Sequence, residues 1–165
     1  MIVFKNIDIL DENFQLKQNV SVRVEGNLIK EISSEPIDQK EADRVIDGKN
    51  RVLIPGFVNA HAHSPMSLMR GYGENMSLQD WLFKRIFPFE DKLNSDAVYY
   101  GTLLTMAESF KYGIVSTSDM YYFVDDMVRA ALESGAKANI SRSITNPAGA
   151  PFDSLESVRE AVEVA

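Results

Sequence analysis

The N-terminal part of the chain alternates between apolar and polar residues. The apolar positions of this alternation are Ile2, Phe4, Ile7, Ile9, Val20, Val22, Val24 and Leu28. A period of two is typical of β-strands, and the segments 25–27 and 47–50 carry the Gly, Asn and Asp residues of turns. Residues 33–43 are polar and charged, which indicates a loop. The pattern predicts a small set of antiparallel strands over residues 1–50.

A different pattern begins at Arg51. Residues 57–63 form an extended apolar run of the kind found in a strand that is buried on both faces. The segments 114–118 and 136–144 predict two further short strands. Each of these three strands is followed by a helical pattern.

The first predicted helix covers residues 95–111. Ser95 can cap its start, and Gly113 fits its end. Its apolar stripe consists of Ala97, Tyr100, Leu104 and Ala107.

Two more helices are predicted nearer the C-terminus. In one, apolar residues recur at helical spacing, and Gly135 provides the end. These apolar residues are Val124, Met127, Val128, Ala131 and Leu132. In the other, Asp153 and Glu156 have the spacing of a capping box, which predicts a helix start at this point.

Strands that alternate with helices predict an α/β fold with a parallel sheet, and three such βα units are visible. A complete barrel of eight units needs about 250 residues, whereas this chain has 165. The last helix reaches Ala165 without a glycine, a proline or a basic last turn. We therefore expect an N-terminal fragment of a larger fold.

Composition narrows the classes of function. The formal charge of -7 comes without a basic face, which argues against a nucleic-acid partner. The sequence shows neither the pattern of a signal peptide nor an apolar run long enough to span a membrane, so we expect a cytoplasmic protein. Because the chain has no cysteine, a transition-metal site would have to consist of histidines and carboxylates.

His61 and His63 are the only histidines in the sequence. Residues two apart in a strand point to the same face, so both imidazoles are expected on one side of the strand. In a barrel, catalytic groups lie at the C-terminal ends of the strands. Two neutral imidazoles on a rigid strand suit Zn²⁺ or Fe²⁺, although by spacing alone a coincidental pair of polar residues is an equal alternative.

The context of the two histidines is specific. Residues 55–63 read PGFVNAHAH, after a β-rich segment and before the βα units. This resembles the first barrel strand of the amidohydrolase superfamily, where such a string carries the first two metal ligands. The resemblance implies the first three βα units of a (β/α)8 TIM-type barrel over residues 51–165, an incomplete metal-dependent hydrolase barrel. Residues 1–50 would be the N-terminal half of a small β-sandwich subdomain.

Other stretches resemble the 5′-methylthioadenosine/S-adenosylhomocysteine deaminases and their chlorohydrolase-like relatives. These stretches are residues 63–72, 78–83, 87–91, 99–102, 119–121 and 141–142. The resemblance implies that His61 and His63 share the metal with a later histidine and a late aspartate. The metal would lower the pKa of a bound water to about 7. The catalytic acid and base would lie beyond Ala165, so no catalytic residue is assigned within this chain.

Three residues are candidates for substrate binding. The resemblance implies that Glu90, in the loop after Pro88, contacts the ribose hydroxyls, and the alternative is a solvated acid. Arg142, at the end of the third strand, suits recognition of a carboxylate tail such as that of homocysteine, and a structural ion pair is the alternative. By analogy, Trp81 would form a wall of the pocket rather than part of the core.

Asp119 follows the second predicted strand. It could orient a metal ligand through a hydrogen bond, which histidine ligands usually require. A carboxylate that caps a local turn is an equal alternative. Both roles would place Asp119 near the metal site.

We thus expect a hydrolase of C–N bonds in cyclic amidines, which deaminates 5′-methylthioadenosine, S-adenosylhomocysteine or adenosine with Zn²⁺, or Fe²⁺, as cofactor. Its partner would be a small purine nucleoside, and a homo-oligomer is compatible with the sequence. One alternative is an amidohydrolase of another aminated or halogenated ring, such as guanine or a triazine. Another is a catalytically incomplete fragment or interaction module. For residues 1–165 alone, we expect weak metal affinity and no turnover.

Overall fold

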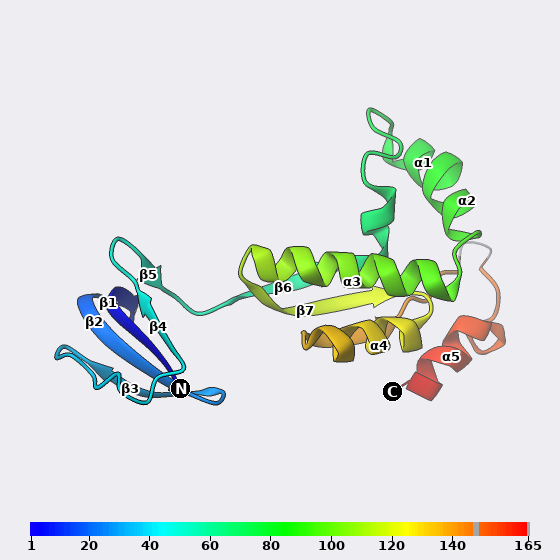
Figure 1. The fold of residues 1–165 in the computed structure, drawn as a ribbon. Coiled ribbons are helices and arrows are strands. Elements are labelled where there is room, and N and C mark those ends of the chain that lie inside the picture. Colours follow the sequence, from blue (N-terminus) through cyan, green and yellow to red (C-terminus); the bar gives the residue numbers. More distant parts are fainter. Residues whose placement is uncertain (147–148, 165) are drawn as a thin grey trace. The chain divides into compact units, whose positions relative to one another are not determined.

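The computed structural model describes residues 1–146 and 149–164. The chain consists of two compact units, Met1–Pro55 and Gly56–Ala165 (Figure 1). The first unit is a five-stranded mixed sheet, and the second combines helices with a three-stranded parallel sheet. No helix in the described part of the chain is long and apolar enough to cross a membrane.

The sheet of the first unit has the strand order β3-β2-β1-β4, with β5 also paired to β1. Its strands are β1 (Ile2–Leu10), β2 (Leu16–Glu25), β3 (Leu28–Ser33), β4 (Arg44–Asp47) and β5 (Val52–Leu53). The prediction of antiparallel strands is right for β1, β2 and β3 but wrong for β4, which runs parallel to β1. Parallel pairing needs a long connection, and residues 34–43 provide it.

The apolar alternation of β1 changes phase between Phe4 and Ile7. The pairing with β2 shifts register at this point, and Asn6 takes a left-handed backbone conformation with φ of 54°. This is the signature of a β-bulge, which inserts one residue and turns the following side chains over. Ile7 and Ile9 are therefore buried against Val20 on β2, and Phe4 packs against the same cluster.

The second unit confirms the predicted alternation of strands and helices. Three parallel strands lie in the order β6-β7-β8. They are β6 (Phe57–Ala62), β7 (Ile114–Tyr121) and β8 (Lys137–Arg142), and the helices that follow them are α3 (Ser95–Lys111), α4 (Val124–Ser134) and α5 (Glu156–Val164). Val98, Tyr121 and Met127 form a buried cluster that joins α3, β7 and α4.

Helix α3 has the predicted bounds, but its buried face differs from the predicted stripe. Tyr100 is 63% exposed, whereas Gly101 and Thr102 are buried. A methyl group added to Gly101 would lie 3.0 Å from the carbonyl oxygen of Pro65, so the helix approaches its neighbour through a small residue. A pattern of large apolar residues cannot reveal this kind of contact. The cap is also one residue earlier than predicted, because the Asn94 side chain accepts from the amide of Ala97.

The two later helices meet their predictions to different degrees. Helix α4 ends as predicted, with Gly135 in a left-handed conformation at its cap. Helix α5 begins at Glu156, and residues Phe152–Ser154 form a separate 3-10 turn. The predicted helix start at Asp153 is therefore wrong. Leu155 between the two elements has an extended backbone, which interrupts the helix.

The segment between β6 and α3 contains four short helical elements. These are η1 (Ser64–Met69), α1 (Leu78–Trp81), the π-helical η2 (Leu82–Ile86) and α2 (Phe87–Glu90). Glu90 is therefore the last residue of a helix, and its predicted place in a loop is wrong. The π-helical stretch precedes Pro88, which has no amide hydrogen to give to a regular helix.

Strand β6 is less buried than its apolar sequence predicted. Phe57 is 56% exposed and Val58 is 68% exposed. Within the described residues, β6 has β7 as its one neighbour in the sheet, so one edge is open. An apolar strand at such an edge is expected to be covered by other structure in a larger fold.

Candidate functional site

The two histidine rings lie on the same side of β6, as the spacing predicted. Their ring centres are 4.9 Å apart, and the planes meet edge to face. His61 is exposed, and His63 is half-buried just after the end of the strand. Two imidazoles that bind one tetrahedral Zn²⁺ at Zn–N distances of about 2.0–2.1 Å have ring centres about 5 Å apart. The observed separation therefore fits a shared ion.

A backbone carbonyl fixes the orientation of His63. The ring nitrogen Nδ1 lies 2.9 Å from the carbonyl oxygen of Met120 in β7. A carbonyl oxygen can only accept, so Nδ1 carries a hydrogen, and in the neutral ring the lone pair is then on Nε2. Metal-binding histidines commonly use such a second hydrogen bond to set the tautomer. No sequence pattern predicts this contact, because any residue at position 120 supplies the same carbonyl.

Asp119 lies in β7 and contacts the backbone directly after His63. It is 3% exposed, and its carboxylate oxygens are 3.2 and 3.3 Å from the backbone amide of Ser64. Asp119 therefore caps the start of η1, 55 residues earlier in the chain, and the predicted alternative of a cap on a local turn is wrong. Because Ser64 follows His63, the cap also holds the backbone beside the histidine ring. Among the described residues, no group of three or more His, Cys, Asp or Glu side chains could hold a metal.

Glu90 accepts hydrogen bonds from two neighbouring tyrosines. The Tyr121 hydroxyl donates to Glu90 Oε1 at 2.6 Å, and the Tyr122 hydroxyl lies 3.5 Å from Oε2. Burial raises the pKa of Tyr121, and the Glu90 carboxylate raises it further. Burial likewise raises the pKa of Tyr122. These contacts fix the position of Glu90, a role that we did not predict for either tyrosine.

The raised pKa of Tyr121 predicts an abnormal alkaline titration. One pH unit above the ordinary tyrosine pKa of about 10, Tyr121 should still be protonated in the folded protein. Since the unfolded chain loses this proton first, the contribution to stability is complete below pH about 10 and decreases above it. The absorbance of tyrosinate at alkaline pH measures how many tyrosines have lost their proton. In denaturant, Tyr121→Phe should reduce the amplitude of this absorbance, because Tyr121 ionises there. In the folded protein, the amplitude should stay the same. An equal reduction in both states would contradict the burial.

Two cavities bring the predicted site residues together. The smaller has a volume of about 170 Å³ and is lined by His63, Trp81, Glu90 and Tyr121, among others. The larger, about 1220 Å³, is lined by Glu90 and Arg142. Glu90 and Tyr122 line both, so the two cavities are adjacent. His61 is not among the described residues that line either cavity.

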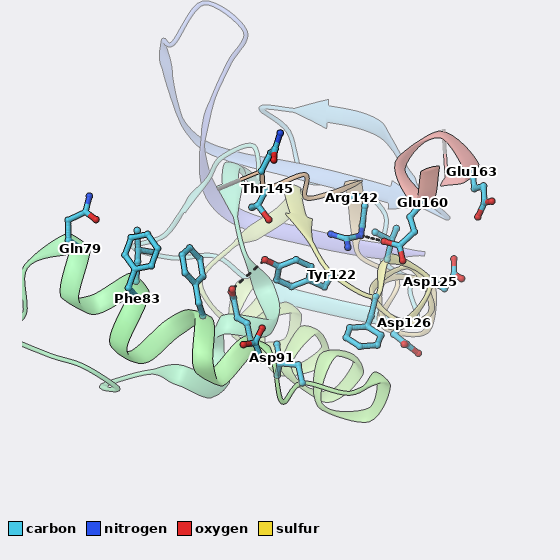
Figure 2. A pocket seen from close by; sticks show the side chains of 17 residues that line it. Gln79, Phe83, Asp91, Tyr122, Asp125, Asp126, Arg142, Thr145, Glu160 and Glu163 are labelled. Atoms are coloured by element: carbon cyan, nitrogen blue, oxygen red, sulfur yellow. Dashed lines mark hydrogen bonds and ion pairs between the residues drawn. The ribbon is translucent and has the colours of Figure 1, made fainter. Parts of the chain in front are cut away.

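Arg142 is the last residue of β8, at the predicted strand end. Its Nε donates to Glu160 Oε2 at 2.6 Å, and its guanidinium lies 4.9 Å from the ring centre of Tyr122. Figure 2 shows Arg142 and Glu160 joined by this contact, and both line the larger cavity. This contact matches the predicted alternative of an ion pair, in a position that also lines the cavity.

Residues 52–165 match the amidohydrolase family. A 5-methylthioadenosine/S-adenosylhomocysteine deaminase from Dictyoglomus turgidum is 38% identical over 148 residues, which cover 90% of this chain and 34% of the relative. A 5′-deoxyadenosine deaminase from Methanococcus vannielii is 47% identical over 120 residues, which cover 72% of this chain and 28% of the relative. The chain thus spans about a third of the length of these curated relatives.

The fold is also similar to solved structures. A crystal structure of an atrazine chlorohydrolase from Arthrobacter aurescens, complexed with zinc, matches 99% of this chain with a TM-score of 0.81. The match covers 42% of that chain at 19% sequence identity. At this identity, the similarity supports the fold and carries no argument about the substrate.

Proposed function

The chain belongs to the amidohydrolase family, and we propose that it is part of a metal-dependent deaminase of adenosine-type nucleosides with a modified 5′ position. Residues 51–165 would supply the first βα units of a (β/α)8 barrel, and residues 1–50 part of a β-sandwich. The observation that carries the proposal is the pair of histidine rings, centred 4.9 Å apart, of which His63 lines the same cavity as Glu90. The deaminase names of the relatives support it.

His61 and His63 would hold the metal, with Zn²⁺ as the first choice and Fe²⁺ as the alternative. When bound, a divalent ion lowers the pKa of a coordinated water and so supplies a hydroxide nucleophile at neutral pH. Because Nδ1 of His63 donates to the carbonyl of Met120, Nε2 is the ring nitrogen that would bind the ion. Two histidines alone bind weakly, and the remaining ligands and the acid and base are expected outside residues 1–165.

The other cavity residues would bind and orient the nucleoside. A carboxylate such as that of Glu90 can accept hydrogen bonds from the two hydroxyls of a ribose. Tyr121 holds one of its oxygens, which limits rotation of the carboxylate before substrate binds. The indole of Trp81 offers an apolar wall that excludes water from the same cavity.

The proposal is tested by ammonia release from the full-length, zinc-loaded protein. We expect turnover of 5′-methylthioadenosine, 5′-deoxyadenosine and S-adenosylhomocysteine, with kcat/KM of at least about 10⁴ M⁻¹s⁻¹ for the best of them. Guanine, followed by ammonia release, and atrazine, followed by chloride release, serve as the alternative ring substrates. Turnover of either ring substrate without turnover of any nucleoside would overturn the proposal.

A further inference from the structure

We propose that Asp119 and Thr105 are positioning residues that fix His63 for metal binding by holding the backbone of Ser64, the residue that follows it. This inference deepens the proposed function and rests on it, because it takes His63 as a ligand. Asp119 lies in β7 and Thr105 lies in α3, so the two side chains reach Ser64 from different elements. Neither side chain has to contact the ion in this role.

Both backbone polar groups of Ser64 are bound by side chains. Its amide donates to the Asp119 carboxylate, whose oxygens lie 3.2 and 3.3 Å away. Its carbonyl oxygen accepts from the Thr105 hydroxyl at 2.7 Å. Ser64 and Asp119 are each only 3% exposed, so water has little access to compete for the amide. A strand and a helix thus fix one peptide unit from two directions.

These contacts begin where the sheet stops holding the chain. Strand β6 ends at Ala62, whose partner in β7 is Asp119. His63 is therefore the first residue outside the strand, and its backbone lacks the rigidity of a position within the sheet. The contacts at Ser64 take over at the next residue. They keep the chain after β6 in place at the point where the imidazole branches from it.

Strand β7 also holds the imidazole of His63 directly. Met120, next to Asp119, supplies the carbonyl oxygen that lies 2.9 Å from Nδ1. Two adjacent residues of β7 thus bind two adjacent residues of the turn after β6. The bond to Met120 depends on the position of the His63 backbone. Release of Ser64 would therefore let the ring leave this bond and lose its fixed orientation.

Helix α3 is well placed to provide the second contact. It packs against η1, and the Ser67 hydroxyl of η1 donates to the Gly101 carbonyl of α3 at 2.9 Å. Thr105 follows Gly101 by one helical turn and so lies on the same face of the helix. Because Gly101 has no side chain, α3 comes close to Pro65. This close approach brings the Thr105 hydroxyl within reach of the Ser64 carbonyl.

The zinc affinity of the full-length protein tests the inference without reference to turnover. Loss of a partner that orients a metal ligand typically costs 10- to 100-fold in affinity. Thr105→Val keeps the shape of the side chain and removes the hydroxyl, so it should raise the zinc Kd about tenfold or more. Thr105→Ser keeps the hydroxyl and should stay within about threefold of the wild type. Competition with a chromophoric chelator measures these values.

The Asp119 variants follow the same logic. Asp119→Ala removes both acceptor oxygens and should also raise the zinc Kd about tenfold or more. Asp119→Asn keeps one oxygen that can accept from the Ser64 amide, so it should recover part of this loss. Because truncation of a buried carboxylate can prevent folding, the Thr105 pair decides the outcome if Asp119→Ala is not obtained as a folded protein.

Thr102→Val is the matched control on the same helix. Thr102 is completely buried, and its hydroxyl donates to the carbonyl of Val98 within α3 at 2.7 Å. The substitution removes a hydroxyl as Thr105→Val does, and should lower Tm to a similar extent. Its zinc Kd should stay within about twofold of the wild type. An unchanged Kd in Thr105→Val, or an equal rise in Thr102→Val, would overturn the inference.

The two proposals fail in different ways. Full zinc content in His63→Asn would overturn the metal assignment of the proposed function. In that case, the ¹⁵N NMR signals of the His63 ring in the zinc-free protein still decide whether Thr105 fixes this ring. A shift from the tautomer with hydrogen on Nδ1 towards the other tautomer in Thr105→Val, but not in Thr102→Val, supports the positioning role. An unchanged tautomer in Thr105→Val rejects it.

Discussion

Replacement of His63 by asparagine in the full-length enzyme is expected to abolish stoichiometric zinc and to lower kcat/KM by at least about 10³-fold. An asparagine amide can still donate to the Met120 carbonyl, as Nδ1 of the histidine does at 2.9 Å. It has no atom in the place of Nε2. The substitution therefore keeps the local hydrogen bond and removes only the lone pair that we assign to the metal. Zinc content by mass spectrometry and ammonia release measure the two effects.

Asn139→Ala is the control for this substitution. It changes an exposed polar residue on β8, two strands away from the histidines, and should keep both zinc and turnover. Retention of one zinc per protein in His63→Asn would show that His63 is not a metal ligand. Loss of turnover with zinc retained would instead assign His63 to positioning of the substrate.

Truncation of Met127 to alanine is expected to lower the free energy of unfolding by about 2–5 kcal/mol. Met127 is completely buried and lies between Val98 on α3 and Tyr121 on β7. Removal of its side chain leaves a cavity at the point where the three elements meet. The shift of the urea midpoint at constant m-value measures the loss.

Leu132→Ala is the matched control on the same helix. Leu132 belongs to the predicted apolar stripe of α4, yet it is 79% exposed. Its truncation should change the free energy of unfolding by no more than about 0.5 kcal/mol. Equal losses for Met127 and Leu132 would mean that α4 does not pack through the Met127 face.

Local signals predicted much of the fold. Gly135 ends α4 because glycine accepts the left-handed conformation that closes a helix, and the sequence displays this directly. The buried face of α3 was not predictable in the same way. Gly101 lies on it because the helix comes close to Pro65, and that contact depends on tertiary structure. The parallel pairing of β4 also depends on the path of the chain after β3.

In the candidate site, too, some features could be predicted from the sequence and others could not. The shared direction of His61 and His63 follows from the strand period, and the structure confirms it. The contacts that fix these groups come from residues more than thirty positions away. Tyr121 binds Glu90 from a distance of 31 residues, and Met120 binds His63 from 57. A single sequence carries no local pattern for such pairs.

The π-helical stretch Leu82–Ile86 decides the angular relation between Trp81 and Glu90. Nine residues separate the two, and at about 100° per residue a regular α-helix would put their side chains on opposite sides. One residue extra within the π-turn takes up about one such step and leaves an angle of about 80°. Both side chains consequently line the smaller cavity. Deletion of a single residue from this stretch would leave a regular α-helix in which eight steps also give about 80°, so the π-turn accommodates its extra residue without moving Trp81 and Glu90 out of phase.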